Sequence, residues 1–221
     1  MYNLTRNNYH QKPKNSTIAT PPAVSQFIFE LLRDKVDQKR SHDDRIFDPC
    51  VGAGSLLKSW TDNGYWTFGI EVDKSLVNRW VILHADFLTL DKKQKSGFDF
   101  REHFKKYAKP QLVLCNPPFN GYGKKLGSEV WLDKIIELFG KEVPVVLFTP
   151  MGFRLNSKKK SQRWSKFIQQ KYPPITSIIS LPRDIFPGIE FHSEILVFNI
   201  KGLEPHYFFS PSNQIEQRTP I

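Results

Sequence analysis

The chain has 221 residues, enough for one domain with a full hydrophobic core. Its 39% hydrophobic and 14% aromatic residues exclude a disordered chain. Lysine and arginine number 32 against 22 acidic residues, and the formal charge of +10 favours a polyanionic partner, of which nucleic acid is the usual one.

Cysteine usage and hydropathy indicate a cytoplasmic protein. Cys50 and Cys115 are too few for a disulfide framework, so we expect reduced thiols in an intracellular compartment. Residues 1–20 are polar, unlike a signal peptide, and no apolar run approaches the length of a membrane span. The six histidines lack metal-ligand spacing, so we expect no metal site.

The first 19 residues have no apolar periodicity and contain several basic side chains. They are either a flexible basic arm that touches a phosphate backbone or a frayed terminus. Thr20 and Pro21 then predict a helix start, with Thr20 as the N-cap. Apolar residues follow with helical spacing, and we expect the helix to pack on a sheet and to end in the charged loop 33–45. They are Val24, Phe27, Ile28, Leu31 and Leu32.

A glycine-rich turn, DPCVGAGS, follows a first predicted strand that begins at Ile46 and leads into a helix. Glycines allow the backbone to approach a ligand closely, and the helix N-terminus offers unpaired N–H groups. The turn lacks the glycine spacing and basic anchor of a diphosphate-binding loop. Asp48 instead places a carboxylate at the strand end, which suits a ligand with hydroxyl and ammonium donors.

Acidic residues also follow the next two predicted strands, 66–70 and 81–84. Glu71 comes about 20 residues after the glycine-rich turn, where an acid usually binds ribose hydroxyls in a βαβ nucleoside site. Asp86 is expected to accept a hydrogen bond from an exocyclic amino group, and Phe87 to flank an adenine ring.

The predicted strand 112–115 halts at Asn116-Pro117-Pro118-Phe119. Both prolines lack an N–H and fix φ, so the chain leaves the strand in a stiff conformation. A carboxamide, an unpaired carbonyl and an aromatic ring then face one spot, which predicts a pocket for a planar group carrying an NH2. The alternative, a plain turn with Phe119 in the core, would be favoured only if this tetrapeptide stood alone.

Two later segments are basic. Residues 120–127 hold three glycines around two lysines, and we expect them to be mobile and to close over a nucleic-acid strand. Residues 154–171 are either a solvated helix face or a phosphate-contacting one. Other segments are predicted from their apolar patterns: a helix and loop in 91–109, a helix in 131–139, strands at 143–149, 175–181 and 195–200, and a loose tail at 203–221.

Strands that alternate with helices predict an α/β sheet with helices on both faces. Asp48, Glu71, Asp86 and Asn116 each follow an apolar strand, at the end where open α/β sheets bind ligands. Each alone fits a loop acid or a helix cap, but four in this order favour one site. The expected organisation is an arm at 1–19, a catalytic domain at 20–201 and a tail at 202–221.

These motifs resemble the S-adenosylmethionine-dependent DNA adenine-N6 methyltransferases. Residues 48–54 are similar to that family's cofactor loop, and residues 116–119 to its NPPF catalytic tetrapeptide. Residues 20–22, which precede the cofactor loop, and the segments 179–186 and 195–198 are similar to type I modification subunits. The resemblance implies a Rossmann-like sheet of seven strands with the last strand antiparallel.

The resemblance also implies a cofactor, S-adenosyl-L-methionine, and its contacts. Asp48, Gly52 and Thr20 would hold its methionine portion, Glu71 its ribose, and Asp86 with Phe87 its adenine. The implied cofactor-binding residues are Thr20, Pro21, Asp48, Pro49, Cys50, Gly52, Gly54, Glu71, Val72, Asp86, Phe87 and Asn116. The implied catalytic residues are Asn116, Pro117, Pro118 and Phe119.

The expected reaction needs no covalent enzyme intermediate. The Asn116 side-chain oxygen and the Pro117 carbonyl would accept both N–H bonds of adenine N6, while Phe119 stacks on a base flipped out of the duplex. Cytosine-C5 methylases also use a Pro-Cys pair, but theirs lies in the catalytic loop. Cys50 is therefore expected to shape the turn, and Cys115 to lie in the core.

Two alternatives remain. The tetrapeptide is shared with methylases of RNA bases and of protein glutamine, and an idle methyltransferase fold could serve as a nucleic-acid-binding subunit. Members of the type I group usually carry a separate target-recognition region, whereas only residues 201–221 follow the last predicted strand. DNA is the expected partner, and a separate specificity subunit or a homodimer is considered for reading the target.

Overall fold

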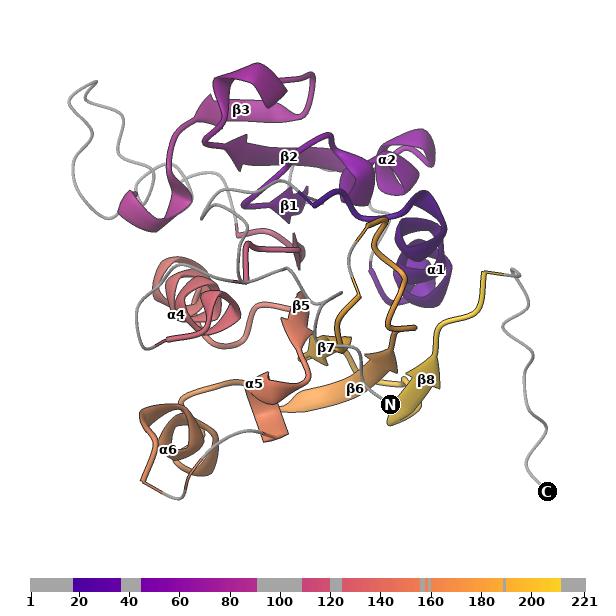
Figure 1. Cartoon of the computed structure of the whole chain (residues 1–221). Helices are drawn as coiled ribbons and strands as arrows, with labels where there is room; N and C mark the ends of the chain where they lie inside the picture. The colour runs from indigo at the N-terminus through magenta and orange to yellow at the C-terminus, as the bar shows by residue number, and fades with distance from the viewer. Residues whose placement is uncertain are drawn as a thin grey trace.

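A single eight-stranded sheet organises the protein, as a computed structural model shows (Figure 1). The structure describes residues 18–36, 45–90, 109–119, 125–155, 158, 160–188 and 190–211. The strand order is β3-β2-β1-β4-β5-β7-β6-β8, and only β7 runs antiparallel to its neighbours. The strands are β1 Arg45–Asp48, β2 Trp66–Glu71, β3 Val81–His84, β4 Leu112–Cys115, β5 Val145–Pro150, β6 Ile175–Ser180, β7 Ser193–Phe198 and β8 His206–Phe208.

Helices cover both faces of the sheet, which confirms the predicted α/β class (Figure 1). Helices α1 and α2 pack on one face, and α4, α5 and α6 on the other. The helices are α1 Pro22–Leu32, α2 Ser55–Asp62, α4 Gly127–Phe139, α5 Gly152–Leu155 and α6 Gln162–Ile168. Short 3-10 turns are η3 Arg33–Lys35, η4 Lys74–Leu76 and η5 Phe87–Thr89.

The central strands divide their side chains between two apolar layers because successive residues of a strand point to opposite faces. In β5, Val146 and Phe148 join the core with α1 and α2. Val145 and Leu147 join the core with α4 and α5. All four side chains are fully buried, which explains why this strand reads as a continuous apolar run rather than an alternating one.

The sheet has eight strands rather than the seven expected. The reversed strand is β7, the seventh along the chain, and β8 extends the sheet by pairing in parallel with β6. The sequence predicts a loose tail from residue 203, but residues 206–208 form this strand. Two of its three side chains, His206 and Phe208, are exposed, so the segment carries little apolar pattern to predict it from.

The start of α1 also differs from the prediction. Its N-cap is Pro21 rather than Thr20, and no side chain caps the helix. The Pro21 carbonyl accepts hydrogen bonds from the N–H groups of Val24 and Ser25. Phe27, predicted in the apolar stripe, is half-buried and packs edge-on against Phe209.

Several predictions lie outside the described residues. They concern residues 1–17, 37–44, 91–108, 120–124, Lys159 and 212–221. Within the described ranges, no helix has both the length and the apolar character needed to span a bilayer.

Candidate active site

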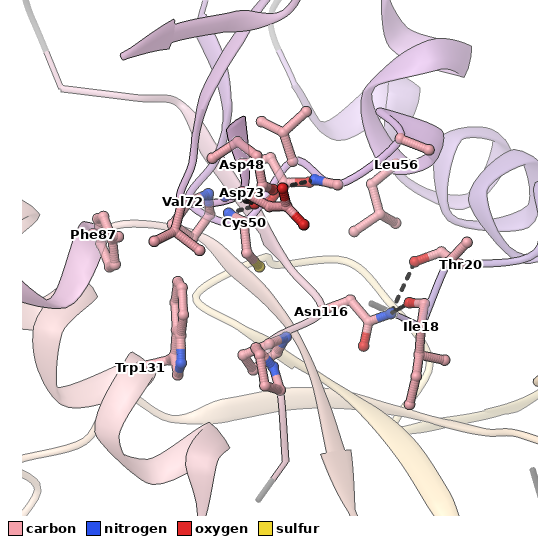
Figure 2. A pocket seen from close by; sticks show the side chains of 18 of the residues that line it. Ile18, Thr20, Asp48, Cys50, Leu56, Val72, Asp73, Phe87, Asn116 and Trp131 are labelled. Atoms are coloured by element: carbon pink, nitrogen blue, oxygen red, sulfur yellow. Dashed lines mark hydrogen bonds between the residues drawn. The ribbon is translucent and has the colours of Figure 1, made fainter. Parts of the chain in front are cut away.

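A cavity of about 270 Å³ lies at the C-terminal ends of β1, β2, β3 and β4 (Figure 2). This is the edge at which open α/β sheets bind ligands. Most residues predicted for the site line it: Thr20, Asp48, Pro49, Cys50, Gly52, Glu71, Val72, Asp86, Phe87, Asn116, Pro117, Pro118 and Phe119. Pro21 and Gly54 are not among the lining residues, because they cap α1 and α2 respectively.

Gly54 shapes the turn rather than the cavity wall. Its φ is 83°, in the left-handed region that favours glycine. A Cβ at this position would lie 2.1 Å from Cε3 of Trp80. The glycine therefore allows the turn to enter α2 beneath the Trp80 ring.

The Asp48 carboxyl group is almost fully buried at the end of β1. Its Oδ1 accepts a hydrogen bond of 2.9 Å from the Cys50 N–H. Burial raises the pKa of Asp48 from 3.8 to about 7, because it outweighs that hydrogen bond, and the nearby Glu71 carboxylate adds to the rise. Ionisation near neutral pH therefore becomes favourable when a cationic or hydroxyl-bearing ligand enters the cavity.

Glu71 fastens the glycine-rich turn to the end of β2. Its Oε2 accepts a hydrogen bond of 2.7 Å from Gly52 N–H, and its Oε1 accepts one of 2.8 Å from Asp73 N–H. The side chain is mostly buried yet lines the cavity. Each carboxylate oxygen has a second lone pair, so Glu71 can also accept hydroxyl donors.

Aromatic rings form one end of the cavity. Phe87, which follows β3, stacks on Trp131 of α4, with ring centroids 5.4 Å apart and an interplanar angle of 13° (Figure 2). Asp86 is exposed, and its Oδ1 accepts a hydrogen bond of 2.9 Å from Leu88 N–H as the cap of η5. This end of the cavity therefore joins a flat apolar surface to a carboxylate, as a purine requires.

Asn116 lies at the other end of the cavity, beside the chain that leads into α1 (Figure 2). Its Nδ2 donates to Thr20 Oγ1 at 3.0 Å and to the Ile18 carbonyl at 3.4 Å. A carbonyl can only accept, so the NH2 half of the carboxamide must face Ile18. Figure 2 shows the Asn116 oxygen directed away from both partners.

The rest of the tetrapeptide is fixed by α4. The Phe119 carbonyl accepts a hydrogen bond of 3.2 Å from Gly127 N–H, at the first residue of α4. A Cβ on Gly127 would lie 1.9 Å from the Pro118 carbonyl oxygen, so only glycine permits this approach. Phe119 is 8% exposed and packs edge-on against Phe191, with centroids 5.2 Å apart, while still lining the cavity.

The two cysteines lie side by side, with Cys50 in the cavity wall and their Sγ atoms 4.0 Å apart. Burial raises the pKa of Cys50 well above its ordinary value and also raises the pKa of Cys115. Because the thiolate is the nucleophile, both thiols are poorly suited to covalent attack on a base. Cys115 is fully buried, as predicted for a core residue.

Three basic residues of the segment 154–171 form ion pairs within the protein. Arg154 donates from Nε and Nη2 to the Glu194 carboxylate, at 2.9 to 3.1 Å. Lys166 binds Asp133 at 2.5 Å, and Arg163 binds Glu129 at 3.3 Å. These pairs hold α5 and α6 against β7 and α4. Other basic side chains of the segment are exposed: Lys158, Lys160 and Lys171.

The structure adds cavity residues that the sequence did not single out. Ile18 supplies a backbone carbonyl, Trp131 was predicted only as part of a helix, and Phe186 with Phe191 comes from the connection between β6 and β7. None lies directly after β1, β2, β3 or β4, so the strand-end pattern gives no signal for them. Among the described residues, no three or more His, Cys, Asp or Glu side chains gather as a metal site would need.

Comparison with known protein families gives a match over most of the chain. A family model described as N-6 DNA methylase matches residues 1–207. No curated protein sequence matches the chain.

Solved structures of low sequence identity share the fold. A protein from Listeria monocytogenes, assigned as a class I S-adenosylmethionine-dependent methyltransferase, superimposes with a TM-score of 0.60 and 16% identity, over 93% of this chain and 68% of that one. For a type I modification subunit from Vibrio vulnificus the TM-score is 0.62 and the identity 14%, over 96% of this chain and 51% of that one. For a type I methyltransferase subunit from Streptococcus thermophilus the TM-score is 0.57 and the identity 16%, over 86% of this chain and 46% of that one. The chain thus spans about half the length of these two subunits.

Proposed function

The chain belongs to the N-6 DNA methylase family, and we propose that it transfers a methyl group from S-adenosyl-L-methionine to the N6 amino group of adenine in DNA. The observation that carries this proposal is the Asn116 carboxamide, whose oxygen accepts no hydrogen bond from the residues that the structure describes, while its NH2 is held by Thr20 and Ile18. An acceptor fixed beside a cavity with a buried acid is what recognition of an amino group requires.

The residues of the cavity fit the cofactor. Asp48 would receive the ammonium group, because a buried carboxyl with a pKa near 7 gains from a cationic partner. Glu71 would accept the ribose hydroxyls. Phe87 with Trp131 would hold the adenine ring, and the second Asp86 oxygen would accept from its amino group.

The protein contributes alignment rather than covalent chemistry. The lone pair of adenine N6 is delocalised into the ring, and acceptors at Asn116 Oδ1 and the Pro117 carbonyl would draw on both N–H bonds and favour a pyramidal nitrogen. When bound, the cofactor would supply an electrophilic methyl group. The N6–C bond would form as the S–C bond broke, with the S–C electron pair left on sulfur and one N6 proton lost to solvent. Phe119 would stack on the flipped base, and such stacking contributes about 1–3 kcal/mol to binding of the base.

The proposed partners follow from charge and from the related modification subunits. The formal charge of +10 favours binding to a DNA backbone. Type I modification subunits share the fold of this chain, so we infer that a separate specificity subunit, or a second copy of the chain, reads the target sequence. We infer a cytoplasmic location, because the proposed substrate is DNA and the thiols of Cys50 and Cys115 are free.

Three variants test the assignment of the site. Asn116→Ala should abolish methyl transfer yet bind S-adenosylhomocysteine normally in calorimetry, because the proposed acceptor serves the target base. Asp48→Ala should lose both methyl transfer and binding of S-adenosylhomocysteine. Asn63→Ala, an exposed asparagine after α2, is the matched control and should keep both. Full methylation by Asn116→Ala would refute the assignment.

A further inference from the structure

The Thr20 side chain does not cap α1, the helix that follows it. A threonine before Pro-Pro predicts an N-cap, yet no side chain caps α1. The residue is 5% exposed, and its Oγ1 instead accepts the 3.0 Å hydrogen bond from Asn116 Nδ2. The two residues lie 96 positions apart in the chain, so the contact exists only in the folded protein.

The orientation of the Asn116 carboxamide depends on this contact. One half of a carboxamide donates and the other accepts, and the two halves occupy nearly the same space. If the Asn116 carboxamide rotated by half a turn, its Oδ1 would face the Ile18 carbonyl oxygen, and Nδ2 would no longer donate to Thr20. Because a hydroxyl can donate or accept, it is the Ile18 carbonyl that decides which half of the carboxamide faces it. That contact is long, at 3.4 Å, and the shorter hydrogen bond to the Thr20 hydroxyl, at 3.0 Å, holds the carboxamide in this orientation.

We propose that Thr20 is a positioning residue for methyl transfer, because its hydroxyl holds the Asn116 carboxamide with Oδ1 turned toward the substrate amino group. This inference rests on the proposed function, since it takes Asn116 as the acceptor for that amino group. A threonine hydroxyl accepts through a lone pair while keeping its own proton. Thr20 lines the cavity, so this proton is available to an anionic group of a bound ligand, and such a bond strengthens the hydroxyl as an acceptor for Asn116.

Two substitutions separate the hydrogen bond from packing. Thr20→Val removes the acceptor at nearly constant volume, whereas Thr20→Ser keeps the hydroxyl and loses only a methyl group. At saturating S-adenosylmethionine, Thr20→Val should lower kcat about tenfold, the loss expected from one well-placed hydrogen bond. Thr20→Ser should stay within about twofold of the wild type, and Thr20→Ala, the second variant without an acceptor, should follow Thr20→Val.

A spectroscopic readout reports the contact without any turnover. In protein labelled with 15N-asparagine, the NH2 signals of Asn116 are those missing from Asn116→Ala. These signals should move, and their protons exchange faster, in Thr20→Val but not in Thr20→Ser. Three results would each overturn the inference. The first is a wild-type kcat in both Thr20→Val and Thr20→Ala, and the second is a defect confined to the KM for the cofactor. The third is an equal loss of kcat in Thr20→Val and Thr20→Ser. A wild-type protein that transfers no methyl group to DNA would refute the proposed function instead, while the NMR comparison would still test the hydrogen bond.

Discussion

Asp48 shows how one residue sets a conflict between folding and binding. Its carboxyl group is buried at the end of β1, and its pKa is raised by burial from 3.8 to about 7. Below this pH the folded protein keeps the group neutral, which suits an apolar surrounding but not an ammonium ligand. Above it the group carries a buried charge, which suits the ligand but not the unliganded fold.

The first consequence is a pH-dependent affinity. Binding of S-adenosylhomocysteine should tighten as pH rises from about 6 to 8, because ionised Asp48 attracts the ammonium group. Asp48→Asn should remove this part of the profile, whereas Asp62→Asn, an exposed control on α2, should retain it. Titration of the ligand itself is common to all three proteins and cancels in the comparison. Identical profiles for the wild type and Asp48→Asn would exclude Asp48 as the ammonium partner.

The second consequence concerns the stability of the unliganded protein, and the sign is opposite. The unfolded chain ionises Asp48 near 3.8 and the folded protein near 7, so between these values the folded state binds more protons. Stability is therefore lost as pH rises through this window. At pH 8, Asp48→Asn should raise the free energy of unfolding, by as much as about 4 kcal/mol. Urea unfolding at pH 8 measures this, and a less stable variant would contradict it.

At the scale of elements, the first residue of α4 fixes the tetrapeptide 116–119. Gly127 donates its N–H to the Phe119 carbonyl and leaves no room for a Cβ beside the Pro118 carbonyl. The sequence predicts a mobile segment over 120–127, but its last residue is the buried start of a helix. The glycine is therefore needed for close packing, a reason that glycine content alone does not reveal.

Substitution of this residue should disturb the active site. Gly127→Ala should lower stability by about 1–3 kcal/mol through overpacking and lower kcat by about 100-fold, because the prolyl carbonyls must move. Gly64→Ala is the control: its φ of 83° costs about 1 kcal/mol, yet a Cβ there meets no atom within 4 Å. Thermal unfolding and single-turnover methylation measure the two effects. Wild-type activity in Gly127→Ala would show that the position of these carbonyls does not matter.

At the scale of the whole molecule, the strand-end pattern explains what the sequence could predict. Asp48 and Glu71 end their strands, Asp86 and Asn116 come just after theirs, and parallel strands bring such ends to one edge of the sheet. The hydrogen bond from Asn116 to Thr20 has no such signal, because it joins residues 96 positions apart.

The role of basic residues on a helix is equally hard to predict from sequence. The predicted alternatives for residues 154–171 were both surface roles, whereas the structure pairs several of these cations with acids of β7 and α4. Those acids lie far away in the chain, so a local pattern cannot distinguish an ion pair from a phosphate contact. The short strand β8 was missed for a related reason, since it is held by backbone pairing with β6.

The central claim is transfer of a methyl group to adenine in DNA. The most direct test supplies S-adenosylmethionine with a labelled methyl group to the protein, together with duplex DNA, RNA and protein pools, and then digests each pool. The account predicts label in DNA, recovered as N6-methyladenine and absent with Asn116→Ala. Label confined to RNA bases or to protein glutamine would contradict it.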